Sequence, residues 1–238
     1  MILIFDFFET LTHNRSTDFN RGLKVMWENY YKDKCTFEEI KEYGEELFQH
    51  MLDLHRQGKE YAFVRDEIPQ YAEKYGGEII HMTANEEADF LMLFNEMETM
   101  PGIPEALSEF EKMRIPMYVL SNSGFTAEAL SVVLERLGIR KYFANIWSSA
   151  DFGRIKPCKD FFDMAIKKAL SDHLEEKRKD IVFVGDMYET DVIGSHNANI
   201  DVIWFNHRQE NNPDLFPVHV ISNAGDLIQI VNEIVKSI

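Results

Sequence analysis

Four short stretches of the chain carry side chains that together could handle a phosphoryl group. Each follows an apolar run, and together they supply a carboxylate, two hydroxyls with an amide, a lysine and a pair of acids. Such a set can attack, hold and neutralise a phosphoryl group. In chain order the stretches are "FDFFETLT" (5–12), with Asp6 and Thr10; "LSNSG" (120–124), with Ser121 and Asn122; "GRIKPC" (153–158), with Lys156; and "VGDMYETD" (184–191), with Asp186 and Asp191.

Each of these residues, taken singly, also has a purely structural explanation. An aspartate, serine or asparagine after a strand often caps the next helix. A lone lysine is usually solvated, and an acid in the first turn of a helix is favoured by the helix dipole. The functional interpretation therefore depends on the set, because side chains at successive strand ends would converge on one crevice.

The elements that must position these residues are five apolar runs of strand length. They cover residues 1–5, 116–120, 144–149, 180–185 and 201–205, and each of the last four follows a stretch with helical spacing. Strands that alternate with helices predict crossover connections, and continuously apolar strands are typical of a parallel sheet covered on both faces. We expect an α/β fold with a parallel sheet flanked by helices.

The segment 16–98 contains no comparable strand run. Apolar residues recur at helical spacing in residues 19–31, 36–56 and 85–97. Pro101 and Gly102 punctuate the return to the sheet, and Pro104 suits the first turn of a helix. We therefore predict a core made of residues 1–15 and 99–238, with residues 16–98 inserted as a helical cap.

Composition narrows the classes of partner. The 238 residues carry a formal charge of −16, from 41 acidic and 25 basic side chains, and such a surface repels nucleic acids and anionic membranes. No apolar stretch approaches the length of a membrane span or a signal segment. Cys35 and Cys158 lack metal-type spacing, so we expect two reduced thiols in a cytoplasmic protein. The sequence does not choose between a monomer and a homodimer.

The order of the four stretches and the residues in them resemble the motifs of the haloacid dehalogenase-like hydrolase superfamily, in particular members with a helical cap inserted after the first motif. The likeness covers nearly the whole chain and implies a Rossmann-like core. It is carried by "IFDFFETL", "PGIPEALSEFEKMRIPMYVLSNS", "YFANIWSSADFGRIKPCKDFF" and "VFVGDMYETDVIGSHNANI", which resemble the four motifs in their usual order.

The resemblance also implies a role for each residue. Asp6 would be the nucleophile that forms an aspartyl-phosphate, and Ser121 and Lys156 would neutralise the phosphoryl oxygens. Thr10 and Asn122 are assigned to binding a small phosphorylated substrate. Mg²⁺ would be the cofactor, held by Asp6, the backbone carbonyl of Phe8 and Asp186, with Asp191 in the same acidic group or just outside it.

Phe8 departs from the phosphatase pattern, in which a second acid at this place protonates the leaving oxygen. A positioned acid contributes roughly 10²- to 10⁴-fold, so a phosphatase without it should be slow on poor leaving groups. Haloacid dehalogenases carry an aromatic residue here and need no metal, which makes a metal-independent dehalogenase the alternative. The paired acids Asp186 and Asp191 favour the phosphatase, because uncompensated carboxylates would repel Asp6. A third alternative is a degenerate member that binds a phosphorylated ligand without turnover.

Some residues near the cap entrance have roles that the sequence leaves open. Glu9 and His13 are candidates for the missing acid, although a surface or hinge position is the simpler interpretation of His13. The basic residues of the early cap either meet an anionic substrate or balance acidic neighbours, and we expect the aromatic residues there to pack the helices together. These residues are Arg15, Arg21 and Lys24, and Trp27, Tyr30 and Tyr31.

Overall fold

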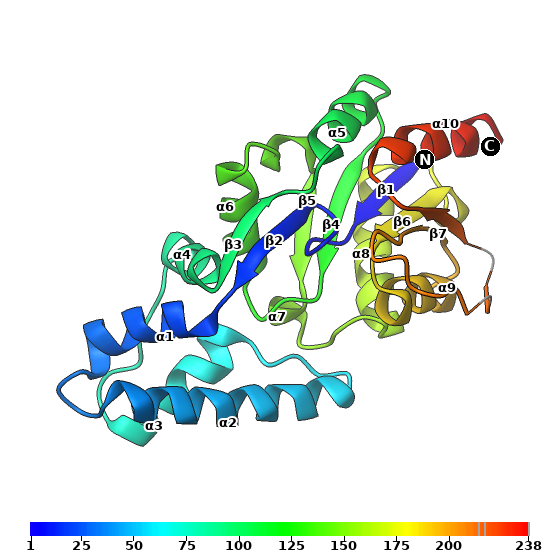
Figure 1. Ribbon diagram of the computed structural model, residues 1–238. Helices are drawn as coiled ribbons and strands as arrows, with labels where there is room; N and C mark the ends of the chain where they lie inside the picture. The colour runs from blue at the N-terminus through cyan, green and yellow to red at the C-terminus, as the bar shows by residue number, and fades with distance from the viewer. Residues whose placement is uncertain (214, 217, 238) are drawn as a thin grey trace.

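The main sheet is parallel throughout. The computed structural model describes residues 1–213, 215–216 and 218–237. Within them, six strands lie in the order β5-β4-β1-β6-β7-β8 (Figure 1). The strands are β1 (Ile2–Phe5), β4 (Met117–Ser121), β5 (Asn145–Ser148), β6 (Ile181–Gly185), β7 (Asp201–Phe205) and β8 (His219–Ile221). The first five confirm the predicted runs and the α/β fold class. The edge strand β8 was not predicted, because it is three residues long and two of them are exposed.

Both faces of the sheet are covered, which explains why the central strands are continuously apolar. Leu3 and Phe5 of β1 belong to one hydrophobic cluster, and Ile2 and Ile4 belong to another on the opposite face. This alternation is the ordinary two-residue period of a strand. Every residue of β1 is therefore buried, and no position is left for a polar side chain until Asp6.

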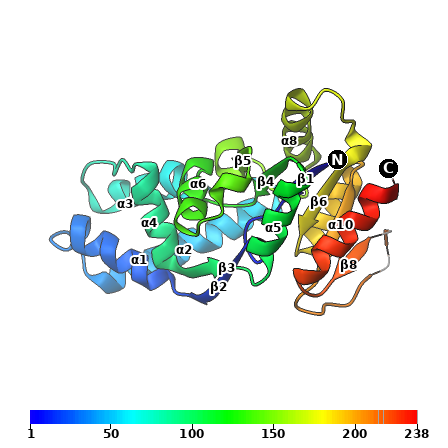
Figure 2. The ribbon, with the colours of Figure 1, turned by 90° about the horizontal axis from the view of Figure 1, so that it is seen from above.

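Helices form the outer layers of the core. Figure 2 shows α8 and α10 on opposite sides of the sheet. One face is covered by α5 (Ile103–Lys112), α6 (Ala127–Arg136) and α10 (Gly225–Ser237), and the other by α8 (Lys159–Asp172) and α9 (Ile193–Asn197). Shorter turns complete the core at α7 (Ser149–Phe152), η3 (Arg140–Tyr142), η4 (Arg178–Asp180) and η5 (Tyr188–Val192).

An antiparallel ribbon joins the core to the inserted segment. Strands β2 (Thr12–Thr17) and β3 (Asn95–Thr99) pair from Thr12 opposite Thr99 to Thr17 opposite Asn95. The prediction of helix to residue 97 is wrong here, because α4 stops at Phe94. Pairing with a strand almost 80 residues away in the chain supplies the backbone partners of β3, and no local pattern signals it. The predicted boundaries at 15/16 and 98/99 fall inside this ribbon.

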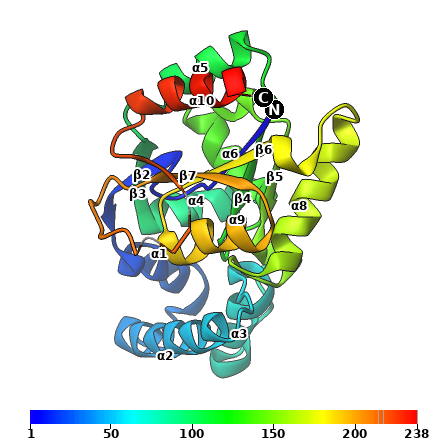
Figure 3. The same cartoon turned by 90° about the vertical axis from the view of Figure 1, so that its right-hand side faces the viewer.

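Helices dominate the cap, as predicted. They are α1 (Phe19–Met26), α2 (Phe37–Arg56), α3 (Ile68–Tyr75) and α4 (Ala84–Phe94), with single π-type turns at η1 (Trp27–Tyr31) and η2 (Phe63–Glu67). Figure 3 shows α2 and α3 at one end of the molecule, far from α5 and α10. Tyr31 is buried in the cap cluster and Trp27 packs against Phe37, so these two rings hold helices together as expected.

Two further expectations concern the whole chain. Cys35 and Cys158 are both free, as predicted. Of the helices in the described residues, none combines the length and the apolar composition needed to cross a membrane.

Candidate active site

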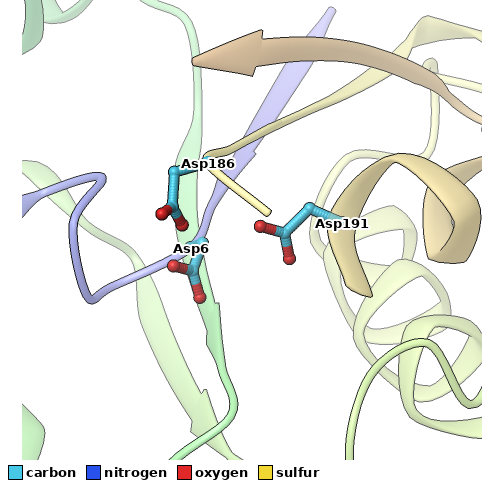
Figure 4. A group of neighbouring side chains, drawn as sticks. All are labelled: Asp6, Asp186 and Asp191. Carbon is cyan, nitrogen blue, oxygen red and sulfur yellow. The ribbon is translucent and has the colours of Figure 1, made fainter. Parts of the chain in front are cut away.

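Four strand ends bring the predicted residues to one edge of the sheet. Asp6 directly follows β1, and its backbone N–H donates to the carbonyl of Val184 on β6 at 2.8 Å. Asp186 directly follows β6, and Asp191 lies on the turn beyond it. Figure 4 shows the three carboxyl groups pointing toward one another from these separate segments. All three side chains are buried, and each has an oxygen within 4.8 Å of the others.

Lys156 lies between two of these carboxylates. Its Nζ donates to Asp6 Oδ1 at 2.6 Å and to Asp191 Oδ1 at 2.7 Å, and only 1% of the residue is exposed. Burial alone would lower the pKa of this amine, but the two carboxylates outweigh it and raise the pKa. The ammonium is therefore charged and held against the predicted nucleophile.

Asn122 fixes the backbone of Lys156. Its side-chain oxygen accepts from the Lys156 N–H at 2.7 Å, and its side-chain nitrogen donates to the Lys156 carbonyl at 3.1 Å. Both ends of the amide are thus used within the protein. The loop after β4 consequently sets the position of a residue that follows β5.

Asp191 is held by protein donors at both oxygens. Oδ1 accepts from Lys156 and from the Thr190 hydroxyl at 3.2 Å, and Oδ2 accepts from the Met187 N–H at 3.0 Å. Gly185 makes this approach possible, because a Cβ there would lie 2.4 Å from Asp191 Oδ2. The geometry suits a residue that orients Lys156.

Asp186 has a different set of neighbours. Its Oδ2 accepts from Arg208 at 2.6 Å, and its carbonyl accepts from Trp204 Nε1 at 2.8 Å. Arg208 was not singled out in the sequence, although "NHR" (206–208) follows β7 as polar residues follow the other strands. His207, on the same loop, has its Nε2 4.0 Å from Asp186 Oδ2.

The three carboxylates together carry more negative charge than is balanced by Lys156 and Arg208, the two cations bonded to them. Burial, followed by the adjacent acids, raises the pKa of Asp186 to about 8. Burial and Asp191 also raise the pKa of Asp6, to about 6, although Lys156 opposes the shift. Clustered carboxylate oxygens short of positive charge are the donor set that a hard divalent cation such as Mg²⁺ binds. The residues present therefore fit the metal that the sequence motifs imply.

Two of the predicted site residues carry buried hydroxyls with weak hydrogen bonding or none. Thr10 and Ser121 are both fully buried. Among the described residues, Thr10 Oγ1 has no hydrogen-bond partner, and Ser121 Oγ makes only a long contact of 3.4 Å to the Asn122 carbonyl. Ser121 ends β4 at this edge, where its hydroxyl can donate to an oxyanion, and the Thr10 hydroxyl is buried and unpaired on the segment after Asp6.

Comparison with known proteins assigns the family. A model of haloacid dehalogenase-like hydrolases matches residues 1–199. The chain belongs to this family of hydrolases. Pyrimidine 5'-nucleotidase YjjG of Escherichia coli (strain K12) is 32% identical over 132 residues, which are 54% of this chain and 56% of that protein. Ribulose-1,5-bisphosphate 5-phosphatase of Halopiger xanaduensis (strain DSM 18323 / JCM 14033 / SH-6) is 25% identical over 58% of each chain. The match thus spans little more than half of these relatives.

Solved structures of the haloacid dehalogenase-like family share the whole fold. A 2-haloacid dehalogenase from Pseudomonas syringae pv. Tomato DC3000 superposes with a TM-score of 0.69 at 19% identity, covering 98% of this chain and 99% of that one. The putative hydrolase YfnB from Bacillus subtilis, bound to magnesium, gives 0.61 at 20% identity, covering 97% and 98%. At these identities the likeness establishes the fold alone.

At the first motif, Phe8 stands where the phosphatase pattern has a second acid, and Glu9 is the adjacent acid. The Phe8 ring packs edge-on against Phe7, with centroids 4.9 Å apart, so no acid occupies its position. Glu9 adopts a left-handed backbone with φ of 54°. Its two oxygens engage His13 Nδ1 at 3.0 Å and the Asn14 N–H at 2.9 Å. Glu9, on the loop before β2, and His13, within β2, are therefore paired with each other.

Two buried acids of the cap, which were not predicted from the sequence, accept hydrogen bonds from the segments that follow β4 and β5. Glu60 accepts from His55 at 2.9 Å and from the Ser149 hydroxyl, and Ser149 Oγ accepts from the Ser123 N–H at 2.8 Å. Glu87 of α4 accepts from the N–H and hydroxyl of Thr126 at 2.7 and 2.6 Å. The loop that follows Ser121 is thus connected to the cap at Ser123, through Ser149, and directly at Thr126.

The basic residues near the cap entrance pair with acids of β3. Arg21 lies 2.6 Å from Glu96, and Arg15 lies 3.6 Å from Glu98. This arrangement follows the charge-balancing interpretation of these side chains.

Proposed function

We propose that this hydrolase is a Mg²⁺-dependent phosphomonoesterase that acts on a small phosphorylated metabolite through an aspartyl-phosphate on Asp6. The observation that carries the proposal is the buried set of three convergent carboxylates with a lysine bonded to two of them. Charge of this density suits a site that receives both a divalent cation and a phosphate.

Asp6 performs the first step in this mechanism. One carboxylate oxygen forms a bond to phosphorus while the bond from phosphorus to the ester oxygen breaks, and the ester oxygen leaves as an alkoxide or aryloxide that takes a proton from solvent water. Water then attacks the phosphorus of the aspartyl-phosphate, which releases phosphate and restores Asp6. The free hydroxyls of Ser121 and Thr10 donate to the phosphoryl oxygens during both steps.

Lys156 supplies fixed positive charge beside the reacting oxygens. Asp191 and Asn122 hold it there, one at the ammonium and the other at the backbone. Asp6, the Phe8 carbonyl and Asp186 would hold Mg²⁺, which would supply further neutralisation of the phosphate charge. Asp191 then acts through Lys156, since both of its oxygens already accept from protein donors.

The names of the relatives support a phosphate ester as substrate. Two of them are called pyrimidine 5'-nucleotidases and a third a ribulose-1,5-bisphosphate 5-phosphatase. Phe8 favours a second candidate, a metal-independent 2-haloacid dehalogenase, because a halide leaves without being protonated. The crowding of Asp186 against Asp6 weighs against this candidate, since it leaves negative charge uncompensated unless a cation binds.

One set of assays separates these functions. Purified protein is given p-nitrophenyl phosphate with Mg²⁺, the same ester with EDTA, and 2-chloropropionate, with Asp6→Asn as the control. We expect hydrolysis of the ester only with Mg²⁺ and none by Asp6→Asn. Chloride release that is indifferent to EDTA would establish the dehalogenase instead, and silence toward both substrates would identify a binding protein.

A further inference from the structure

A cavity of about 420 Å³ lies between the cap and the core, separate from the carboxylate cluster. Its walls come from α1, α2, the 61–71 segment and Phe94 of the cap, and from Gly124 and Phe125 of the core. Trp27, Tyr30 and Tyr31, which were expected to pack helices together, are not among its lining residues.

Seven of the seventeen residues that line the cavity are aromatic. The ring centroids of Phe63 and Phe125 lie 5.2 Å apart, and those of Phe19 and Phe94 lie 5.6 Å apart. Phe19 is 48% exposed, which is unusual for so large an apolar ring that has a cluster of rings beside it. The rings that line the cavity are Phe19, Phe48, Tyr61, Phe63, Tyr71, Phe94 and Phe125. Such walls favour a flat ligand that stacks on them.

Three carboxyl residues also line the cavity, and of these Asp18 and Glu45 are exposed whereas Glu67 is half-buried. Glu67 also lines the cavity, and among the described residues its carboxyl has a single hydrogen-bond partner, the Tyr71 hydroxyl at 3.4 Å. Burial raises the pKa of Glu67 to about 7. At neutral pH this group can therefore donate as well as accept, which suits a ligand edge carrying both kinds of atom.

On the core side, the cavity is lined by the loop that follows Ser121. Gly124 is three residues beyond Ser121, so their Cα atoms are at most about 11 Å apart. The Gly124 carbonyl accepts from the Phe63 N–H at 2.7 Å, and a Cβ on Gly124 would lie 3.2 Å from the Tyr61 carbonyl. The cap wall is thus fixed against the loop that holds the predicted phosphate donor.

We propose that this cavity receives the base of a nucleoside 5'-monophosphate whose phosphate is bound at Asp6. The inference depends on the proposed phosphatase function and specifies its substrate class. A nucleobase offers flat faces to the rings and a hydrogen-bonding edge to Glu67. An aliphatic chain would leave Glu67 without a partner, and a bare sugar phosphate would leave the aromatic walls in contact with water.

Ribose 5-phosphate provides the matched test, because it has the same ester oxygen as a nucleotide but no base. With Mg²⁺ present, we expect kcat/KM for UMP, CMP or AMP to exceed that for ribose 5-phosphate by about tenfold or more. Glu67→Leu should reduce this ratio by about threefold or more while stacking on the rings keeps it above unity, and Glu67→Gln, which keeps a donor and an acceptor, should restore most of it. Tyr30→Leu, which alters an exposed cap ring outside the cavity, should leave the ratio unchanged.

Binding measured without turnover separates this inference from the proposed function. Calorimetry in EDTA should show that the same nucleotides bind more tightly than ribose 5-phosphate, and that Glu67→Leu reduces the difference. Equal kcat/KM and equal binding for nucleotides and ribose 5-phosphate, with both hydrolysed, would overturn the cavity assignment and leave the phosphatase intact. Base-dependent binding without hydrolysis of any ester, acetyl phosphate included, would support the cavity and overturn the phosphatase.

Discussion

Two regions of this molecule hold acids whose pKa is raised to between about 6 and 8, and the causes of the shift differ between them. At the sheet edge, burial and the neighbouring carboxylates of Asp6 and Asp191 raise the pKa of Asp186 to about 8. In the cap cavity, Glu67 is raised to about 7 by burial, with no neighbouring charge contributing. A bound cation would reverse the first shift and leave the second in place. The acids of the sheet edge therefore act as charges to be neutralised, whereas Glu67 of the cavity acts as a neutral hydrogen-bonding group.

The largest expected effect concerns the metal. Asp186→Asn removes one of the clustered carboxylates, so Mg²⁺ affinity should fall at least about tenfold and turnover should fall with it. Arg208→Gln should instead strengthen Mg²⁺ binding, because Arg208 competes for Asp186 Oδ2 at 2.6 Å. Titration calorimetry measures both. Equal Mg²⁺ binding by wild type and Asp186→Asn would mean that the acids of the sheet edge do not hold the cation.

A smaller gain is expected from restoring the acid that Phe8 replaces. Phe8→Asp should raise hydrolysis of alkyl phosphates by about tenfold or more, while Phe8→Asn, which also loses the ring, should not. Wild type should strongly prefer aryl and acyl phosphates, whose leaving groups need no proton. A flat dependence of wild-type rate on leaving-group pKa, with no gain in a folded Phe8→Asp variant, would show that another residue transfers the proton.

The smallest effect is on stability and involves Glu67 alone. Its pKa of about 7 in the folded protein lies above the ordinary 4.5. Between these values the folded state binds more protons than the unfolded state, so its contribution to stability falls as pH rises through this window. Glu67→Gln should therefore exceed wild type in free energy of unfolding by about 1–3 kcal/mol at pH 8 and match it near pH 4.

Urea denaturation of both proteins across this range measures the difference. The shifts of Asp6 and Asp186 are common to both proteins and cancel. Lys41, Glu45, Tyr61 and Tyr71 also line the cavity, and Glu45→Gln on its exposed rim is the matched control. A difference between wild type and Glu67→Gln that stays constant with pH would contradict the neutral carboxyl.

The two regions also differ in how much of them the sequence predicts. The strands were predictable because Ile2 to Phe5 are buried on alternate faces, and Asp6 follows them at a place where a parallel sheet collects ligands. The convergence of Lys156 and Asp186 with Asp6 follows from the same rule. Arg208 follows a fifth strand and could have been found in this way.

Much less of the cap structure could be predicted from the sequence. The cavity draws its lining from residues between Thr17 and Phe125 that share no spacing, so no local pattern marks it. Glu60 and Ser149 bond across 89 residues of sequence, and β3 depends on its pairing with β2. Such features come from tertiary contacts that override local propensity, which is why helix was expected through Met97.

The central claim is that Asp6 carries the phosphoryl group, and trapping that intermediate tests it most directly. Protein mixed with Mg²⁺ and p-nitrophenyl phosphate is quenched in acid during the first turnover and digested, and its peptides are analysed by mass spectrometry. Because Phe8 leaves no carboxylate placed to act as a base on the attacking water, we expect the phosphoryl group to accumulate on the peptide containing Asp6, and to be absent with EDTA and from Asp6→Asn. Phosphate release by wild type with that peptide unmodified, or an equal phosphoryl yield from Asp6→Asn, would contradict the account.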